Sequence, residues 1–316
     1  NNGVESNRIR DDFNKQIIDK GVKVNTILEE NYEEEKRTSG LIYSGIYNTN
    51  SGINNLNQFI QAEKITKDLN PDYGSIQKLY SRSTADGDLI ALCEDRVIKI
   101  LANKDALFNA DGNANLTSTN NVLGQAIPYA GEYGISHNPE SFAADNYRAY
   151  FADKQRGAVL RLSMDGLTPI SEYGMSDYFK TALLTNGSLV GSFDDKKNEY
   201  NLTIPMKHTT VSFKESVNGW SSFKSFSPEQ ALSMGNDYYT LKEGLPYKHH
   251  VKTDLAGNDV DRNTFYGEYT PSSVSVLLND NPSVIKSYKN LSYEGSQSKI
   301  LKEDTDVNTG YYNLEE

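Results

Sequence analysis

Carboxylate pairs are the residues of this chain whose types and spacing come closest to catalytic chemistry. Asp194-Asp195 and Asp259-x-Asp261 could in principle supply the acid and the base with which glycosidases cleave a glycosidic bond. Both pairs lie among turn-forming residues, where aspartate commonly bonds to the local backbone. We therefore predict structural roles for them and no catalytic residue in the chain.

The histidines give little indication of a metal site. His137, His208, His249 and His250 are not spaced as the ligands of a zinc ion are. If His249 and His250 lie in a strand, their rings face opposite sides of it. We interpret all four as structural or surface residues and predict no metal and no cofactor.

An Asx-rich segment resembles a calcium loop only superficially. Asn109, Asp111, Asn113 and Asn115 place oxygen atoms at alternate positions, but the closing glutamate and the midloop glycine are missing. A solvent-facing turn is the better interpretation. The sequence also has no phosphate-binding glycine loop with its lysine and no nucleophile elbow.

The single cysteine and a group of aromatic residues are further candidates for function. Cys93 ends the apolar run Leu-Ile-Ala-Leu-Cys, which predicts a small core residue in a strand instead of a nucleophile. An aromatic group could line a sugar or peptide groove, although packing in the core and between sheets is the preferred interpretation. Its members are Phe213, Trp220, Phe223 and Phe226.

Composition limits the partners that these residues could serve. The 316 residues carry a formal charge of -11, which opposes the basic surface that nucleic-acid-binding proteins need. An acidic channel wall would instead repel phosphates and let DNA slide past. No apolar run approaches the roughly 20 residues that span a bilayer, so we predict no membrane insertion.

The order of patterns along the chain predicts three parts. Residues 1–72 form an N-terminal helical or extended arm, with Ile9, Phe13 and Ile17 at helical spacing, that makes an inter-subunit contact. Residues 73–300 form a β-propeller-like domain. Residues 301–316 are a C-terminal tail or a truncation point.

The predicted β domain consists of clusters of short strands separated by turns. Three strands are expected between residues 75 and 101, four between 140 and 170, four between 187 and 226, and a weaker group between 231 and 250. Their turns recur at roughly 40 to 60 residues, near the blade repeat of propellers. The fold class is therefore mainly β, with propeller-like repeated antiparallel sheets, and a β-sandwich is the alternative. Residues 266–278 also have a strand-like pattern.

Several long strings carry a resemblance to a known family. They include GEYGISHNPESF at 131–142, RAYFADKQRGAVLRL at 148–162, FKESVNGWSSFKSFSPE at 213–229 and NDNPSVIKSYKNLSYEG at 279–295. These strings resemble the stabilisation, or muzzle, proteins of crAss-like bacteriophages that infect Bacteroidales. Family members are longer than this chain, which leaves open whether it is a cleaved product or part of a subunit.

The resemblance implies a structural, non-enzymatic virion protein of a short phage tail. Such a protein is made in the bacterial host cytoplasm and forms a homo-oligomeric ring with other tail proteins. The ring closes or extends a channel through which genomic DNA passes without sequence-specific binding. The alternatives are a carbohydrate-binding or glycan-degrading propeller at the host surface and a peptide-binding scaffold.

Overall fold

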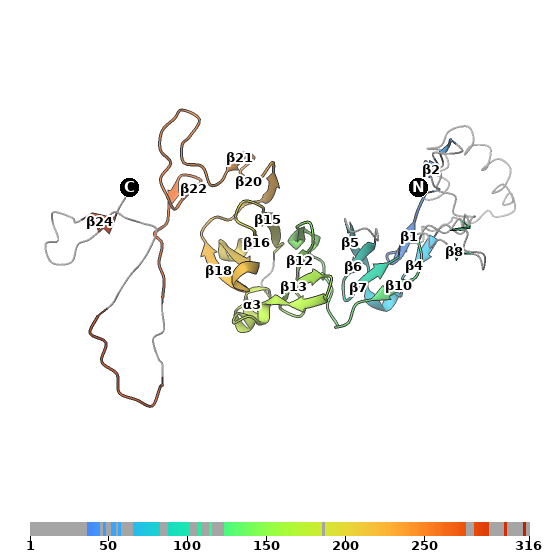
Figure 1. Ribbon diagram of the computed structural model, residues 1–316, viewed down its shortest axis with the longest axis horizontal. Helices are drawn as coiled ribbons and strands as arrows, with labels where there is room; N and C mark the ends of the chain where they lie inside the picture. The colour runs from blue at the N-terminus through green and yellow to red at the C-terminus, as the bar shows by residue number, and fades with distance from the viewer. Residues whose placement is uncertain are drawn as a thin grey trace, which may run out of the picture. The chain divides into compact units, whose positions relative to one another are not determined.

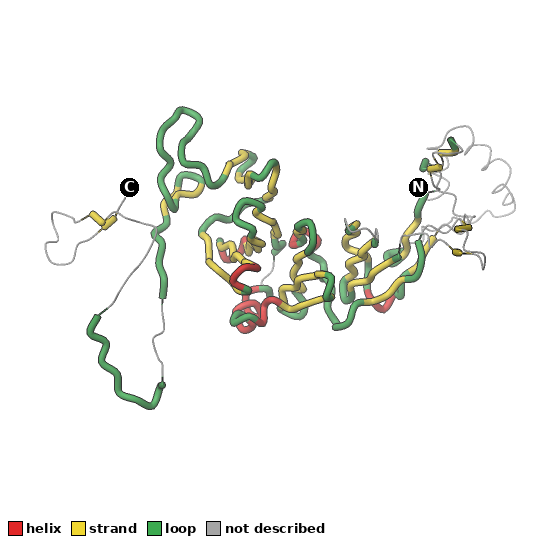
Figure 2. Tube along the Cα trace, in the orientation of Figure 1, coloured by secondary structure: helices red, strands yellow, loops and turns green. Residues whose placement is uncertain are grey.

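The computed structural model describes most of the chain between residues 37 and 290 (Figure 2). The described residues are 37–44, 47–48, 52–54, 56–57, 66–82, 88–101, 107–108, 114–115, 123–184, 187–275, 281–290, 300–301 and 312–313. The chain divides into two compact units, Asn1–Thr270 and Pro271–Glu316. The described part contains no helix that is both long enough and apolar enough to cross a membrane.

Four antiparallel sheets follow one another along the first unit (Figure 1). Sheet 1 contains β5 (Ile76–Ser81), β6 (Leu89–Cys93), β7 (Val97–Ile100) and β10 (Ala126–Pro128). Sheet 2 contains β11 (Ala143–Ala144), β12 (Ala149–Asp153), β13 (Ala158–Ser163) and β14 (Gly166–Pro169). Sheet 3 contains β15 (Val190–Asp194), β16 (Glu199–Ile204), β17 (Thr209–Lys214) and β18 (Gly219–Lys224). Sheet 4 contains β19 (Gln230–Met234), β20 (Asp237–Lys242) and β21 (Leu245–Lys248).

Each strand pairs with the next strand of its sheet, except that a small hairpin interrupts sheet 1. This hairpin, β8 (Leu107–Phe108) with β9 (Ala114–Asn115), precedes the return of the chain as β10 along β7. The repeated four-stranded order confirms the predicted mainly β fold with propeller-like repeated antiparallel sheets. Sheet 4 has three strands, in agreement with its weaker sequence pattern.

Strands of sheet 2 bury both of their faces, because alternate side chains enter different cores. Ala149 and Phe151 of β12 pack with sheet 1 residues such as Leu92. Tyr150 and Ala152, on the opposite face, pack with sheet 3. A strand that is buried on both sides reads as a nearly continuous apolar run, as β12 does.

One short helix contributes to the core between sheets 2 and 3. The helix α3 (Ser176–Ala182) follows β14 and the 3-10 turn Ile170–Glu172, and it buries Phe179 and Ala182. Phe179 packs against Trp220 with ring centroids 4.5 Å apart. The helix therefore belongs to the contact between the two sheets.

The segment before sheet 1 covers the outer face of that sheet. The strands β1 (Gly40–Ile42) and β4 (Thr66–Asp68) pair with each other, and Leu69 packs with Cys93 and Ile98 of sheet 1. A short pair, β2 (Tyr47–Asn48) with β3 (Ile53–Asn54), lies between them in the sequence. The predicted boundary at residue 72 and the predicted inter-subunit role of the arm stay predictions. The helical stripe at residues 9–17 lies outside the described residues.

The C-terminal part differs from the expected pattern. The hairpin β22 (Thr264–Phe265) with β23 (Glu268–Tyr269) occupies the start of the strand-like stretch, but residues 271–275 form no strand. The strand-like stretch 266–278 is therefore a strand only at β23 among the described residues, because alternation alone does not supply a neighbouring strand to pair with, and residues 276–278 lie outside the described part. Of the predicted tail at 301–316, the structure describes residues 301 and 312–313, within the pair β24 (Ile300–Leu301) and β25 (Tyr312–Asn313).

Candidate functional site: the contacts between successive sheets

The polar residues of the first unit concentrate where one sheet meets the next, often at the end of a strand. Asp153 closes β12 and its side chain is fully buried. Its carboxylate accepts hydrogen bonds from Gly134 N at 3.1 Å and from Ser136 Oγ at 2.9 Å, both in the segment that leads from sheet 1 to sheet 2. Arg156 donates to it from the backbone and from the guanidinium, each at 3.1 Å.

Arg156 extends this contact to sheet 1. A second nitrogen of its guanidinium lies 3.1 Å from Asp95 Oδ1, in the turn after β6. The guanidinium of Arg156 therefore binds the buried Asp153 of sheet 2 through one nitrogen and Asp95 of sheet 1 through another. A buried carboxylate with several charge-assisted bonds gives a rigid contact, since each bond restricts the others.

Asp194 occupies a comparable position at the end of β15, between sheets 3 and 4. Its buried carboxylate accepts from the amides of Lys196 and Lys197 at 3.1 Å each, and its other oxygen lies 2.6 Å from Nε2 of His250. These bonds to the turn amides are the local backbone contacts expected of an aspartate in a turn, and the structural role of Asp194 stays a prediction. Asp259 and Asp261 of the second pair are exposed. The backbone of Asp259 forms an isolated antiparallel β-bridge with Thr253.

Glu94, after β6, is a third carboxylate that ties segments together. Its Oε1 accepts from both the amide and the hydroxyl of Ser75, and its Oε2 lies 3.2 Å from Nε2 of His137. The hydrogen bonds from Ser75 lower the pKa of the Glu94 carboxyl, and the charge of His137 adds to this effect. The contact joins the start of sheet 1 to the segment that enters sheet 2.

Two glycines allow the backbones of successive segments to cross at these contacts. A Cβ atom on Gly134 would lie 2.0 Å from the carbonyl oxygen of Glu94, and one on Gly191 would lie 1.8 Å from the carbonyl oxygen of Ser141. Neither distance is possible for a real side chain. Both positions therefore require glycine because of close backbone approach and not because of an unusual φ.

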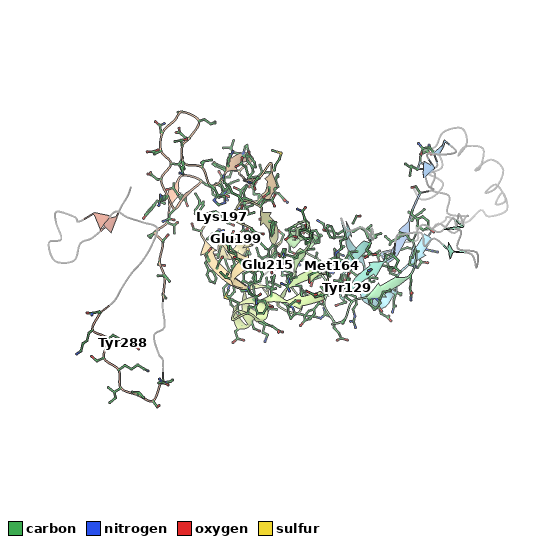
Figure 3. All side chains as sticks on the ribbon, in the orientation of Figure 1. Tyr129, Met164, Lys197, Glu199, Glu215 and Tyr288 are labelled. Carbon is green, nitrogen blue, oxygen red and sulfur yellow. The ribbon has the colours of Figure 1, made fainter. Side chains whose placement is uncertain are left out.

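Sheets 2 and 3 are also joined by Glu215, in the turn after β17 (Figure 3). Its two oxygens accept from the hydroxyl of Tyr150 and from the guanidinium of Arg161, both at 2.9 Å. Tyr150 stacks on Tyr200 of β16 with ring centroids 4.9 Å apart. Polar and aromatic contacts therefore act together at this junction.

The junction between sheets 3 and 4 is mostly polar. Ser192 of β15 shares a 2.8 Å hydrogen bond with the hydroxyl of Tyr238, which lies on β20. Within sheet 3, on the face that carries Ser192, Glu199 of β16 accepts from Lys224 Nζ at 2.9 Å and Asn201 accepts from Ser212 Oγ at 2.6 Å. These side chains are buried or nearly so, which makes their hydrogen bonds necessary.

His249 and His250 do not alternate across a strand, contrary to the expectation. β21 ends at Lys248, and His250 has a positive φ of 59°. The two rings consequently lie on the same side, with centroids 6.0 Å apart. The ring of His249 is buried and its Nε2 lies 2.8 Å from Thr240 Oγ1.

Burial lowers the pKa of His249 from 6.5 to about 4, and the charge of His250 acts in the same direction. The unfolded chain therefore binds a proton between pH 6.5 and pH 4 that the folded chain does not. Stability from this group is fully present above pH 6.5 and falls as the pH decreases towards 4, by at most about 3 kcal/mol. The charge of Asp194 raises the pKa of His249, and the charge of Lys224 lowers it.

We expect His249→Gln to flatten the dependence of unfolding free energy on pH between 6.5 and 4. Urea unfolding followed by circular dichroism at a series of pH values measures this slope. His208→Gln, at an exposed turn, is the matched control and should leave the slope unchanged. An unchanged slope in the His249 variant would show that this ring titrates normally.

The predicted core roles of the aromatic group are confirmed for two residues. Phe213 and Phe226 are buried, and Trp220 packs partly buried against Phe213 while Nε1 donates to the Ile170 carbonyl at 3.0 Å. Phe223 is 57% exposed and packs edge-on against Tyr178, so the prediction was wrong for this residue. Phe223 lies on β18, an edge strand of sheet 3.

Cys93 is fully buried in β6, which confirms its predicted place in a strand interior. Burial raises the pKa of its thiol to about 11, and the nearby Glu94 charge adds to the shift. Only about one thiol in a thousand is then ionised at pH 8. We expect an aromatic disulfide reagent at pH 8 to label Cys93 only after unfolding; rapid stoichiometric labelling of the folded chain would contradict this.

Metal binding gains no support from the described part of the chain, which holds no group of three or more His, Cys, Asp or Glu side chains arranged around one point. His137 contacts Glu94, whereas His208 lies at an exposed turn. Of the Asx-rich segment, only residues 114–115 and the preceding 107–108 are described. The absence of catalytic, cofactor and metal residues stays a prediction.

Comparison with known proteins finds relatives of this chain among phage proteins. The Crassvirus muzzle protein C-terminal domain matches residues 260–316. The muzzle protein of Bacteroides phage crAss001 is 22% identical over 228 residues, which cover 68% of this chain. The chain is related to the muzzle proteins of crAss-like phages. The predicted resemblance is confirmed, and the chain spans 15% of the length of that muzzle protein.

Some solved structures outside the muzzle proteins are weakly similar. Virginiamycin B lyase from Staphylococcus aureus is 13% identical with a TM-score of 0.33, over 61% of each chain. A nidogen/laminin complex contains a chain that is 13% identical with a TM-score of 0.27, over 56% of this chain and 76% of that one. These scores are too low to support any argument about activity.

Proposed function

We propose that this chain is a structural, non-enzymatic segment of a phage muzzle that forms a homo-oligomeric ring around the DNA channel of a short tail. The observation that carries the proposal is the relationship to phage muzzle proteins. The chain of sheets joined by buried polar contacts supports it physically. We further propose that it resides in the virion together with other tail proteins.

Rigidity is the property that the inter-sheet contacts provide. Asp153, Asp194 and Glu215 each hold donors from two different segments. Removing one donor would leave the buried carboxylate incompletely compensated, so small displacements between sheets cost free energy. A wall that encloses pressurised DNA needs this resistance to displacement.

The charge of the chain suits passage of DNA without binding. A net charge of -11 repels phosphates at distances within about one Debye length, roughly 8–10 Å at physiological salt. An acidic wall therefore disfavours the counterion-releasing contacts that hold proteins on DNA. We expect no measurable retention of duplex DNA by the purified chain at 150 mM salt.

Glycan cleavage is the alternative that the acidic pairs first suggested. Burial, followed by the charge of Asp194, raises the pKa of Asp195, a property that general acids share. The second carboxylate would have to be Asp194, whose two oxygens are already engaged by turn amides and His250. The structure of this pair therefore favours a turn anchor.

The test is to locate the chain in purified particles. Peptide mass spectrometry of virions and cryo-electron microscopy of the tail are expected to find residues 37–290 in several symmetry-related copies. Absence of these peptides from particles that package DNA would overturn the proposal. Depolymerisation of capsule glycans that is abolished by Asp195→Asn would support the enzymatic alternative instead.

A further inference from the structure

The segment of residues 281–290 exposes several apolar side chains to solvent. Ile285 is fully exposed, and Val284 and Tyr288 are each more than half exposed. Tyr288 is labelled in Figure 3. The segment forms no helix or strand, and its own bonds include Val284 N to the Asn281 carbonyl. Neighbouring exposed apolar residues on a segment without a core indicate a binding surface.

The same segment is basic in an acidic chain. Lys286 and Lys289 lie between and after the apolar residues, and residues 281–290 contain no Asp or Glu. The whole chain carries a charge of -11. The segment is therefore attracted to a surface with the charge of the rest of this chain.

Sheet 4 carries an apolar face with acidic residues at one end. The register places Leu232 opposite Tyr239, and the same face carries Met234 and Leu241. Leu232 and Met234 are exposed, at 46% and 64%. The opposite face of the sheet carries the buried Tyr238 and contacts sheet 3.

The acidic end of this face is formed by two glutamates. Glu229 and Glu243 are both exposed, and the amide of Glu243 donates to Oε1 of Glu229 at 3.2 Å. They flank the Gln230–Leu241 pair at the turn end of the sheet. The same face also carries Lys248, opposite Tyr239, and its ammonium is paired with Asp237. The face of sheet 4 therefore has the apolar residues, and at its Glu229–Glu243 end the negative charge, that complement residues 281–290.

We propose that residues 281–290 of one copy lie across the outer face of sheet 4 of a second copy. The inference rests on the self-assembly in the proposed function and names the surfaces that make it. Because the two surfaces on each chain differ, the contact is heterologous and repeats from copy to copy. Such contacts close into a ring when the rotation between copies allows it.

The occupant covers the face of sheet 4 and does not extend its edge. Pro246 lies in β21, one edge strand of the sheet, and has no backbone N–H to donate to an added strand, while β19, the other edge strand, lies against β15 of sheet 3. Side-chain packing on Leu232 and Met234, together with lysine–glutamate pairs, is therefore the mode of contact. Continuous strand pairing is not part of it.

Engineered disulfides test this arrangement in the full chain. Ile285→Cys is introduced into a copy with one tag and Leu232→Cys into a copy with a second tag. The two copies are mixed and mildly oxidised. Cys93 is fully buried and does not compete. We expect a covalent dimer that contains both tags. Met164→Cys, at an exposed turn of sheet 2, replaces Leu232→Cys as the control and should give at least tenfold less dimer.

Charge reversal provides a second measurement. Lys286→Glu with Lys289→Glu should weaken self-association at least tenfold in analytical ultracentrifugation, and Glu229→Lys with Glu243→Lys on the other copy should restore it. Copies that associate but yield neither the dimer nor the restoration would overturn this contact and leave the ring intact. A third variant carries Ile285→Cys and Leu232→Cys in the same chain. If this variant forms its disulfide within one chain, the proposed contact between copies is overturned. Copies that do not associate at any concentration would overturn self-assembly itself, while detection in virions would still support a structural role.

Discussion

Gly191→Ala is expected to lower the free energy of unfolding by more than about 4 kcal/mol, or to prevent folding. A Cβ at this position would lie 1.8 Å from the carbonyl oxygen of Ser141 and 2.4 Å from its carbonyl carbon. The obstacle is backbone, so no rotation of a flexible side chain can relieve it. Sheets 2 and 3 would have to separate, which would expose the core around Tyr150 and Tyr200.

The matched control is Gly219→Ala in β18 of the same sheet. A Cβ there meets nothing closer than the Val217 carbonyl oxygen at 3.7 Å, which is ordinary contact. We expect this variant to change the unfolding free energy by at most about 0.5 kcal/mol. Urea denaturation of both variants measures the difference, and equal stabilities would show that the two sheets do not approach as described.

Asp153→Ala is expected to cost about 3–5 kcal/mol, because it removes a buried carboxylate that accepts from the guanidinium and the amide of Arg156 and from two other donors. The amide of Gly134 and the hydroxyl of Ser136 would lose their acceptor in a place that water does not reach. Sheets 1 and 2 would then be joined mainly by apolar packing.

Asp165→Ala, at an exposed turn of sheet 2, is the control for a change in net charge and should be nearly neutral. Thermal unfolding and hydrogen exchange are the measurements. Exchange of the Gly134 and Ser136 amides should increase strongly in the Asp153 variant. If the two aspartate variants unfold at the same temperature, the buried network contributes nothing to stability.

The sheets could be predicted from the sequence because each strand carries its own signal. Residues 148–162 combine apolar runs with a turn at 153–157, and the structure has β12 and β13 there. The polar junction between sheets 3 and 4 was not predictable in the same way. The alternation of Glu199, Tyr200 and Asn201 in β16 is typical of a half-exposed strand, yet the whole strand is buried.

The close backbone approaches at two glycines also could not be predicted from the sequence. Gly134 and Gly191 differ from the other glycines only in which backbone atoms lie next to them, and this depends on how segments far apart in sequence meet. The positions of His249 and His250 were predicted wrongly for a related reason. The strand ends one residue before them, and the ends of elements are decided by tertiary contacts.

The burial of β12 on both sides has a consequence for how such proteins vary among phages. Deleting or inserting one residue within this strand would exchange Tyr150 and Phe151 between the two cores, and each core is shaped for the other ring. Length changes should therefore be excluded from strands of this kind and accumulate in the turns between them. Alignments of distant relatives should therefore place gaps in the turns around β12 and β13 and preserve the alternation of the two faces along these strands, even where few identical residues remain.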